Sequence, residues 1–228
     1  MANSIFMTGG TGFLGTEIAA DLINYTDEKV YVLVRAENME AAYHRLKTAW
    51  YPFPELREKI GTQFIPVIGD FTIPDLGLST QDREMLLSEV DRIFHVGAEV
   101  MLQKDSQELI AKNRKGTKHV LSLGLAIHRN RGLGRFVHVS TSYVAGQRSG
   151  RIMEEDELGN SFSTQYEKTK AQAEIMVKRS GLPYSICRPG MIVGDSRTGW
   201  VKNFNTVYYV WKLLLTGNYR IFPVDKYM

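Results

Sequence analysis

Tyr166 and Lys170 stand four residues apart within the helical pattern of residues 164–180. Four residues make about one helical turn, so the two side chains would share one face of the helix. A free phenol has a pKa near 10 and exchanges protons slowly at neutral pH. An ammonium ~5 Å away, at an effective dielectric constant of ~20, would stabilise the phenolate by about 3 kcal/mol and lower that pKa by about two. The spacing predicts Tyr166 as general acid and base for a substrate oxygen, with Lys170 as its cationic partner.

Three hydroxyl side chains, Ser140, Thr141 and Ser142, end the apolar run that starts at residue 136. If this run is a strand of a parallel sheet, the hydroxyls lie at its carboxyl end, where such sheets bind ligands. One of them could donate a hydrogen bond to a substrate carbonyl and stabilise its developing negative charge. They could instead satisfy only backbone groups, and a tyrosine and a lysine at this spacing also occur by chance. The two features together favour catalysis.

Gly9, Gly12 and Gly15 lie between a strand-like run and a helical pattern. Gly9 allows a tight turn, Gly12 lets the backbone approach a pyrophosphate, and Gly15 lets helix and strand pack closely. Free N–H groups at the start of the helix would bind the phosphates. A P-loop is a poor alternative, because Thr16 and Glu17 stand where lysine and a hydroxyl residue would be needed. The pattern predicts a dinucleotide-binding turn.

Arg35 ends the second strand-like run, about twenty residues beyond the last glycine of the turn. An acidic residue at this place would hold the adenosine ribose 2′-hydroxyl of NAD, whereas a guanidinium offers a fork of donors to a 2′-phosphate. Arg35 therefore predicts NADP(H), although it could also be a solvated residue at a strand end. Asp70 follows the third run, after Ile68 and Gly69, and could accept a hydrogen bond from the adenine amino group, or it could only cap a loop.

Short apolar runs alternate with amphipathic stretches along the chain, which is the pattern of βαβ units. The pattern predicts an α/β fold with a doubly wound parallel sheet of Rossmann type, covered by helices on both faces. Aromatic residues become frequent after Gly194. We therefore expect a dinucleotide-binding domain over residues 1–194 and a partial, truncated substrate-binding region over 195–228. The expected strands are residues 5–8, 30–34, 64–68, 92–96, 136–140 and 184–187, and the expected helices are 13–25, 39–50, 81–89, 106–128 and 164–180.

Composition narrows the classes of function. Of the 228 residues, 43% are hydrophobic and 23% charged, and the net charge is +3, values typical of a globular protein. No run of lysine and arginine and no known reader motif points to nucleic acid. Cys187 is the single cysteine. An internal disulfide is therefore excluded, and the apolar neighbours of Cys187 favour a buried thiol.

Absent sequence features lead to expectations about location, metal binding and hydrolase activity. No apolar stretch approaches the ~20 residues that span a bilayer, and the N-terminus lacks the arrangement of a signal peptide. We therefore expect a cytoplasmic protein. The five histidines show no metal-ligand spacing, so no metal is expected. The sequence contains no Gly-x-Ser-x-Gly elbow, so a hydrolase is not expected. The oligomeric state stays open.

Together these features resemble the extended short-chain dehydrogenase/reductase superfamily over essentially the whole chain. The resemblance rests on the glycine turn, Asp70, Tyr166 with Lys170, and residues 95–98, 113–117, 140–142 and 188–190. Within that superfamily the chain is most similar to thioester reductase-like proteins, which include fatty acyl-CoA reductases and the reductase domains of carboxylic acid reductases and nonribosomal synthetases. This narrower likeness rests on residues 33–36, 68–71, 136–146 and 188–195. Gly97 departs from the alanine usual in that group, and the C-terminal region is shorter.

The resemblance implies roles for individual residues. Thr141 stands 25 residues before Tyr166, the usual separation in the family, which favours it over its neighbours as the hydroxyl partner. Lys170 would also hydrogen-bond the nicotinamide ribose. Asn113 would lie near the site, with a structural or a functional role. The implied cofactor contacts are Gly9, Thr11, Gly12, Phe13, Leu14, Gly15, Arg35, Asp70, Phe71, Gly97, Ala98, Lys170, Pro189, Gly190 and Ile192.

The resemblance implies an NADPH-dependent oxidoreductase that reduces an acyl thioester, or a related carbonyl, to an aldehyde or alcohol. The acyl group would be carried by CoA or by an acyl carrier protein acting in trans. Alternatives on the same scaffold are a nucleotide-sugar epimerase or dehydratase and a hydroxysteroid-type dehydrogenase, for which NAD would be more usual. Arg35 argues against these. A non-catalytic NADP(H)-sensing regulator is favoured by the short C-terminal region and opposed by the intact Tyr166 and Lys170.

Overall fold

The computed structural model describes residues 4–99, 106–202, 204 and 206–217. Two compact units make up the chain, Met1–Met191 and Ile192–Met228. The division falls three residues before the boundary predicted at residue 194. The first unit contains the whole sheet and every predicted site residue except Ile192. That the second unit binds substrate remains a prediction.

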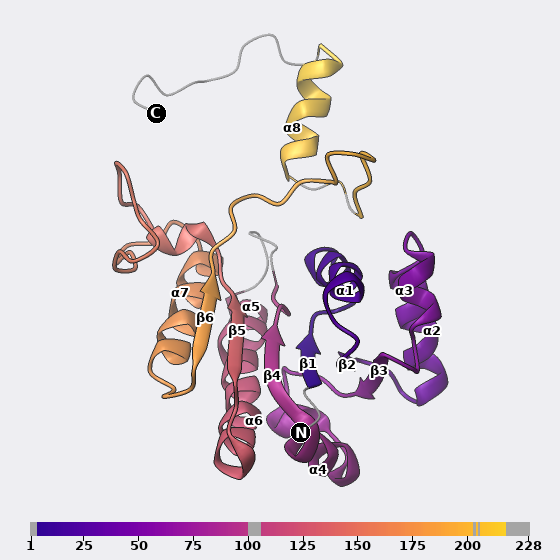
Figure 1. Ribbon diagram of the computed structural model, residues 1–228. Helices are drawn as coiled ribbons and strands as arrows, with labels where there is room; N and C mark the ends of the chain where they lie inside the picture. Colours follow the sequence, from indigo (N-terminus) through magenta and orange to yellow (C-terminus); the bar gives the residue numbers. More distant parts are fainter. Residues whose placement is uncertain (1–3, 100–105, 203, 205, 218–228) are drawn as a thin grey trace. The chain divides into compact units, whose positions relative to one another are not determined.

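In its described residues the first unit has six parallel strands, β1 (Ser4–Thr8), β2 (Lys29–Val34), β3 (Phe64–Ile68), β4 (Val90–His95), β5 (Arg135–Val139) and β6 (Tyr184–Cys187). They form one sheet in the order β3-β2-β1-β4-β5-β6 (Figure 1). The chain starts at the centre, runs outward to β3, and returns to place β4 on the other side of β1. Doubly wound sheets bind ligands at the carboxyl ends of the strands next to such a reversal. The predicted doubly wound α/β fold is confirmed.

Helices cover both faces of the sheet, and the alternation of side chains along β1 explains why. Ile5 and Met7 pack in one apolar cluster with residues of α1 (Phe13–Tyr25), α2 (Met39–Ala49) and α3 (Pro54–Glu58). Phe6 points to the other face. It packs in a second cluster with residues of α4 (Thr80–Glu89), α6 (Gly116–Arg131) and α7 (Gln165–Lys178).

The helix predicted over residues 106–128 is interrupted by a wider turn. It consists of α5 (Ser106–Leu109), the π-helical segment η2 (Ile110–Lys115) and α6. Asn113, which is buried in η2, accepts a hydrogen bond from Glu99 N at 2.8 Å and donates to Glu99 O at 3.0 Å and to Thr169 Oγ1 at 3.3 Å. Single π turns inside helices often occur at functional sites. Here the turn lets one amide side chain connect the segment after β4 to α7.

The prediction of a buried final strand and a buried Cys187 is wrong. Within the described residues β6 pairs only with β5 at the edge of the sheet, and Tyr184 and Cys187 are both exposed. The apolar character of the run predicted a strand correctly, but it carried no information about whether that strand would be central or at an edge. The short helix α3 and the 3-10 turns η1 (Pro74–Gly77) and η3 (Ser142–Ala145) were also not predicted.

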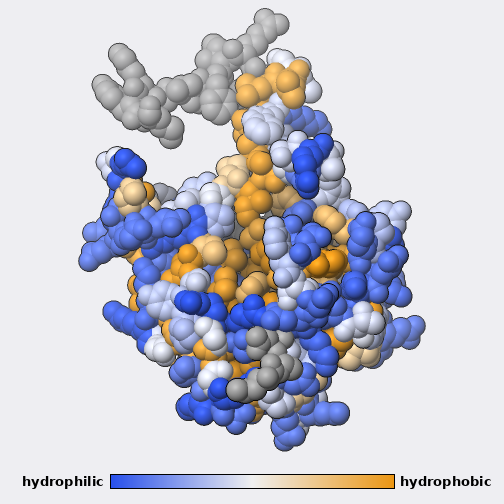
Figure 2. All heavy atoms as spheres, in the orientation of Figure 1, coloured by the Kyte–Doolittle hydropathy of each residue, from blue (hydrophilic) through white to orange (hydrophobic). Residues whose placement is uncertain are grey.

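The second unit contains α8 (Thr206–Leu215), a helix that the sequence patterns did not predict. Within this unit the backbone N–H of Gly194 donates to the Tyr208 hydroxyl at 2.6 Å. The sequence of α8 is largely hydrophobic, and hydrophobic residues gather over it in Figure 2. No helix in the described part of the chain is both long enough and apolar enough to cross a membrane.

Candidate active site

The three predicted catalytic residues lie at the carboxyl end of β5. The N-cap Thr164 starts α7 by accepting a backbone hydrogen bond at 3.2 Å. This start places Tyr166 in the first turn and Lys170 one turn later, and both side chains are buried. The Thr141 side chain favours the ionised form of the Tyr166 phenol, and Lys170 Nζ donates to the carbonyl of Val139 at 2.6 Å. The structure therefore brings Thr141, Tyr166 and Lys170 together around one strand end.

The electrostatics of this group differ from the prediction. Burial raises the pKa of Tyr166 above its ordinary value, and the Thr141 side chain opposes this only in part. Burial also lowers the pKa of Lys170 to about 8, against the charge of Glu174, which raises it. The predicted lowering of the phenol pKa is therefore wrong, because desolvation of the buried phenol has the largest effect. The phenol stays protonated at neutral pH, which is the form that a general acid needs.

A buried carboxylate on α7 fixes the backbone beside Thr141. Glu174 is fully buried, accepts hydrogen bonds from Ser140 Oγ at 2.8 Å and Arg188 Nε at 3.1 Å, and pairs with Lys178 Nζ at 3.1 Å. Burial alone would raise the pKa of Glu174, but its hydrogen bonds, that of Arg188 foremost, lower it below its ordinary value. The network joins the end of β5, the segment after β6, and α7. Sequence patterns did not point to Glu174.

Two buried histidines pack next to each other on β4 and β5. The rings of His95 and His138 stack with centroids 5.4 Å apart. His95 bridges the hydroxyls of Thr8 at 2.7 Å and Thr117 at 3.0 Å, while the His138 ring has no hydrogen-bond partner among the described residues. Burial first, and the charge of Lys170 second, lower the pKa of His95 to about 3 and that of His138 well below its ordinary value. Both rings are therefore neutral at physiological pH.

The glycine turn has the conformation that its sequence predicts. Gly9 has φ +77°, in the left-handed region, and its carbonyl accepts from Gly12 N at 2.9 Å. A Cβ on Gly15 would lie 2.1 Å from Gly9 O, so only glycine fits where α1 crosses the turn. Trp50, buried at the end of α2, donates its indole N–H to Gly10 O at 2.8 Å. The Trp50 side chain thus satisfies a backbone carbonyl of the turn, and no local sequence signal indicated that role.

A cleft of about 250 Å³ lies at the carboxyl ends of β1, β2, β3 and β4. Its wall includes more than half of the predicted cofactor contacts. These are Gly9, Thr11, Gly12, Arg35, Asp70, Phe71, Gly97 and Ala98. The other predicted site residues of the first unit do not line this cleft. They are Phe13, Leu14, Gly15, Thr141, Tyr166, Lys170, Pro189 and Gly190. The position of the cleft over β1–β4 is the place where the adenosine half of a dinucleotide would bind.

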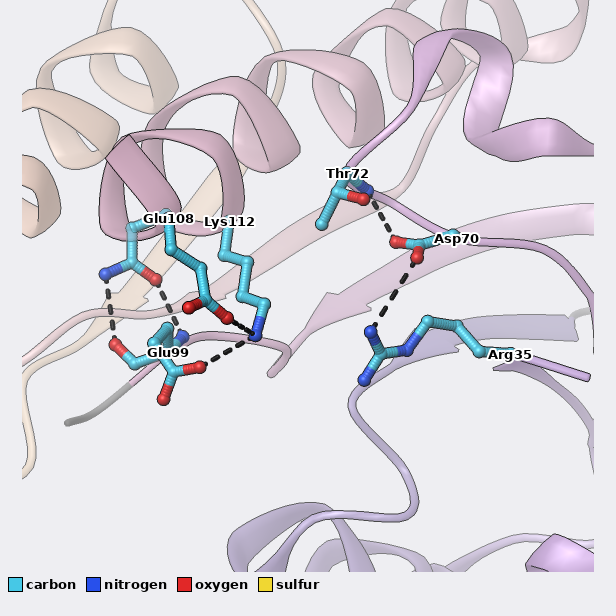
Figure 3. Close-up of polar contacts among 7 residues, drawn as sticks. Arg35, Asp70, Thr72, Glu99, Glu108 and Lys112 are labelled. Carbon is cyan, nitrogen blue, oxygen red and sulfur yellow. Dashed lines mark hydrogen bonds and ion pairs between the residues drawn. The ribbon is translucent and has the colours of Figure 1, made fainter. Parts of the chain in front are cut away.

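Cationic side chains of the cleft lie next to carboxylates (Figure 3). Arg35 Nη1 lies 3.8 Å from Asp70 Oδ2, and Lys112 Nζ lies 2.8 Å from Glu99 and 2.6 Å from Glu108. A further cation, which sequence reasoning missed, also lines the cleft. Arg45 of α2 donates from Nη1 to the carbonyl of Arg35 at 3.1 Å. Arg45 lies ten residues after Arg35, in a helical pattern. From the sequence alone it could not be told from a solvated arginine on the helix surface.

The residues predicted to border the nicotinamide lie after β6, and the first of them is next to the end of β5. Ser142 N donates to Pro189 O at 2.9 Å, which joins the segment after β6 to the end of β5. A Cβ on Gly190 would have Ser142 Oγ 3.9 Å away as its nearest neighbour. Ile192 belongs to the second unit. Contacts of Pro189, Gly190 and Ile192 with a nicotinamide ring remain predictions.

Comparison with known families identifies the chain. Residues 7–228 match the model of an NAD-binding family described as "Male sterility protein". The chain belongs to this family. One relative, fatty acyl-CoA reductase wat of Drosophila melanogaster, is 28% identical over 258 residues, which cover 97% of this chain and 49% of that protein.

Among solved structures, the terminal R domain from the myxalamid PKS-NRPS biosynthetic pathway has a TM-score of 0.83 and 31% identity, and the match covers 92% of this chain and 54% of that chain. The chain thus spans about half the length of these relatives. The predicted thioester reductase-like and fatty acyl-CoA reductase-like branch is confirmed. A UDP-glucuronic acid 4-epimerase from Bacillus cereus, with a TM-score of 0.61 and 22% identity over 84% of this chain and 57% of that chain, shares the fold alone.

The space around Gly97 leaves no room for a side chain. Gly97 stands after β4, where the resemblance led us to expect alanine. A Cβ there would lie 2.8 Å from the Phe71 ring, and a Cβ on Gly116 would lie 2.5 Å from the same ring. Phe71 therefore occupies the space between the cleft wall and α6, and both glycines make room for it.

Proposed function

We propose that this chain is the dinucleotide-binding and catalytic part of an NADPH-dependent oxidoreductase that reduces acyl thioesters to aldehydes, with further reduction to alcohols. One observation carries the proposal. A buried, protonated Tyr166 phenol, whose pKa is influenced by Thr141, lies at the same edge of the sheet as a cleft lined by the glycine turn and Arg35. Membership of the family supports the reductase class, and the likeness to a fatty acyl-CoA reductase of Drosophila supports a thioester substrate.

The residues of the cleft fit a phosphorylated dinucleotide. The left-handed Gly9 and the missing side chain at Gly12 leave the backbone of the turn open to a pyrophosphate, and the close approach at Gly15 brings the N-terminus of α1 beside it. Arg35 and Arg45 line the cleft where an adenosine ribose would lie. Planar guanidinium groups bind phosphate oxygens in a bidentate way. These two side chains support NADP(H) rather than NAD(H).

In the proposed chemistry Tyr166 transfers the proton and Thr141 donates a hydrogen bond. When bound, NADPH supplies a hydride to the carbonyl carbon of the thioester. Tyr166 donates its proton to the carbonyl oxygen as that oxygen gains negative charge, and a hemithioacetal forms. The Thr141 hydroxyl donates a hydrogen bond to the phenolate that remains. The phenolate then takes the hydroxyl proton back, the C–S bond breaks, and the thiolate leaves and is protonated by solvent.

The acyl donor in this proposal is bound to CoA or to a carrier protein that acts in trans. The balanced reaction consumes one thioester, one NADPH and one proton, and it releases one aldehyde, one thiol and one NADP⁺. Release of thiol separates this activity from the reduction of a free aldehyde or ketone. An epimerase on the same fold would show no net consumption of reduced cofactor.

The test is a screen of the full chain against acyl-CoA thioesters of increasing length, free aldehydes, ketones and nucleotide sugars. Oxidation of NADPH and release of free thiol are followed together. We expect thiol and NADP⁺ to appear together with at least one acyl-CoA, in equal amounts where the aldehyde is released and with a second NADP⁺ per thiol where the aldehyde is reduced to the alcohol. Oxidation of NADPH by ketones alone, or by no compound in the screen, would overturn the proposed thioester reductase.

A further inference from the structure

Asp70 holds the arginine that would recognise a 2′-phosphate. Its Oδ2 atom faces Arg35 Nη1 at 3.8 Å, and its Oδ1 atom accepts a hydrogen bond from Thr72 N at 2.8 Å (Figure 3). A second backbone contact, from Asp70 N to Leu76 O at 2.7 Å, ties the same residue to the turn η1. The carboxylate is therefore fixed by its own loop, and it is the Arg35 side chain that must adjust.

Both members of this pair are within reach of a ligand. Arg35 and Asp70 line the same cleft, with side chains 53% and 25% exposed. A guanidinium that already faces a carboxylate has part of its field neutralised before a phosphate arrives. The carboxylate also repels that phosphate directly, because like charges a few ångströms apart remain coupled in a partly dry cleft. Asp70 thus opposes the selectivity that Arg35 provides.

We propose that Asp70 is a specificity-determining residue that weakens the preference of this cleft for a 2′-phosphorylated dinucleotide, by holding Arg35 and by repelling the phosphate. This inference rests on the proposed NADP(H) site. Asp70 is also predicted to accept a hydrogen bond from the adenine amino group. Adenine is common to NADPH and NADH, so that contact cancels in the ratio of their dissociation constants. The ratio isolates the effect of Asp70 on the phosphate.

The experiment measures the Kd of the full chain for NADPH and for NADH, by quenching of protein fluorescence at low ionic strength. Asp70→Asn removes the charge and keeps an oxygen for the Thr72 N–H. We expect it to raise the ratio Kd(NADH)/Kd(NADPH) by about 3- to 10-fold. The gain should shrink as salt is added, because salt screens partly exposed charges.

Two further variants keep the proposal falsifiable. Asp70→Ser can still cap the Thr72 N–H through its hydroxyl and should give a gain of the same sign. Asp75→Asn removes a charge from the same loop at an exposed residue outside the cleft wall, and it should leave the ratio unchanged. Thermal unfolding verifies that each variant is folded.

The outcomes separate this inference from the proposed function. If Arg35→Gln lowers the ratio but both Asp70 variants leave it within twofold of wild type, NADP(H) recognition stands and the role of Asp70 is refuted. If the wild type binds NADH as tightly as NADPH, the proposed cofactor preference itself is refuted. A gain that is equal in the Asp75→Asn control would also refute a specific role for Asp70.

Discussion

Removal of the Glu174 carboxylate should destabilise the first unit more than any other single change to a charged group of the site. Glu174 is fully buried and binds Ser140, Arg188 and Lys178. In Glu174→Ala, the Arg188 side chain, which is only 11% exposed, would keep its charge without this counter-ion. Removal of one partner from a buried ion pair costs about 3–5 kcal/mol. For a chain of this size each kcal/mol lowers Tm by about 2–4 °C.

We therefore expect Glu174→Ala to lower Tm by roughly 6–20 °C in thermal unfolding followed by circular dichroism. Glu174→Gln keeps an oxygen for Ser140 and should lose about half as much. Glu84→Ala, which removes an exposed carboxylate from α4, serves as the control and should change Tm by little.

The pH dependence of the stability tests the same contacts of Glu174 independently. The partners of Glu174 hold its pKa below the ordinary value of 4.5. Its contribution to stability is therefore complete above that pH and is lost as the pH falls through the lowered pKa. Wild type should lose this increment below about pH 4.5, whereas Glu174→Gln should not. A Tm of Glu174→Ala within about 2 °C of wild type, less than 1 kcal/mol, would refute the reasoning.

The remaining predictions concern the cofactor and the proton. Arg45→Ala should weaken NADPH binding by about 10-fold, the value of one lost charged contact, and should leave NADH binding unchanged; equal losses for both dinucleotides would contradict the phosphate contact. Trp50→Phe should lower the free energy of unfolding by about 1–3 kcal/mol, because Gly10 O loses its buried donor, and an unchanged value in urea titrations would contradict this support. The reduction rate should fall as the pH rises through about 8, where Lys170 loses its proton. Lys170→Arg, if it turns over, should lack that limb, and the same limb in both proteins would assign it to another group.

The sequence predicted most of the sheet because each strand is a short apolar run between turn residues. The bounds of β3 and β6 match the predicted runs, and the other strands differ by at most two residues at either end. The glycine turn was also predictable, since the demands of Gly9 and Gly15 on φ and on space are local. Local rules are enough where neighbours in sequence determine the geometry.

What the sequence did not reveal depends on contacts between distant residues. The support of Gly10 by Trp50 spans 40 residues, and the contact of Ser140 with Glu174 spans 34. Neither leaves a periodic or spacing signal. The shift of the Tyr166 pKa was predicted in the wrong direction, because the prediction included the charge of Lys170 and left out burial. The sequence does not reveal whether a residue in the first turn of a helix is buried.

The proton donor is the centre of the account, and it can be tested in one comparison. The measurement is the rate of NADPH oxidation with an acyl-CoA substrate for wild type, for Tyr166→Phe, and for Tyr25→Phe, which removes an exposed phenol at the end of α1. Loss of a general acid typically costs ~10²-fold or more. The account predicts that loss for Tyr166→Phe and a wild-type rate for Tyr25→Phe, with both variants folded. A Tyr166→Phe rate within a few-fold of wild type would contradict it.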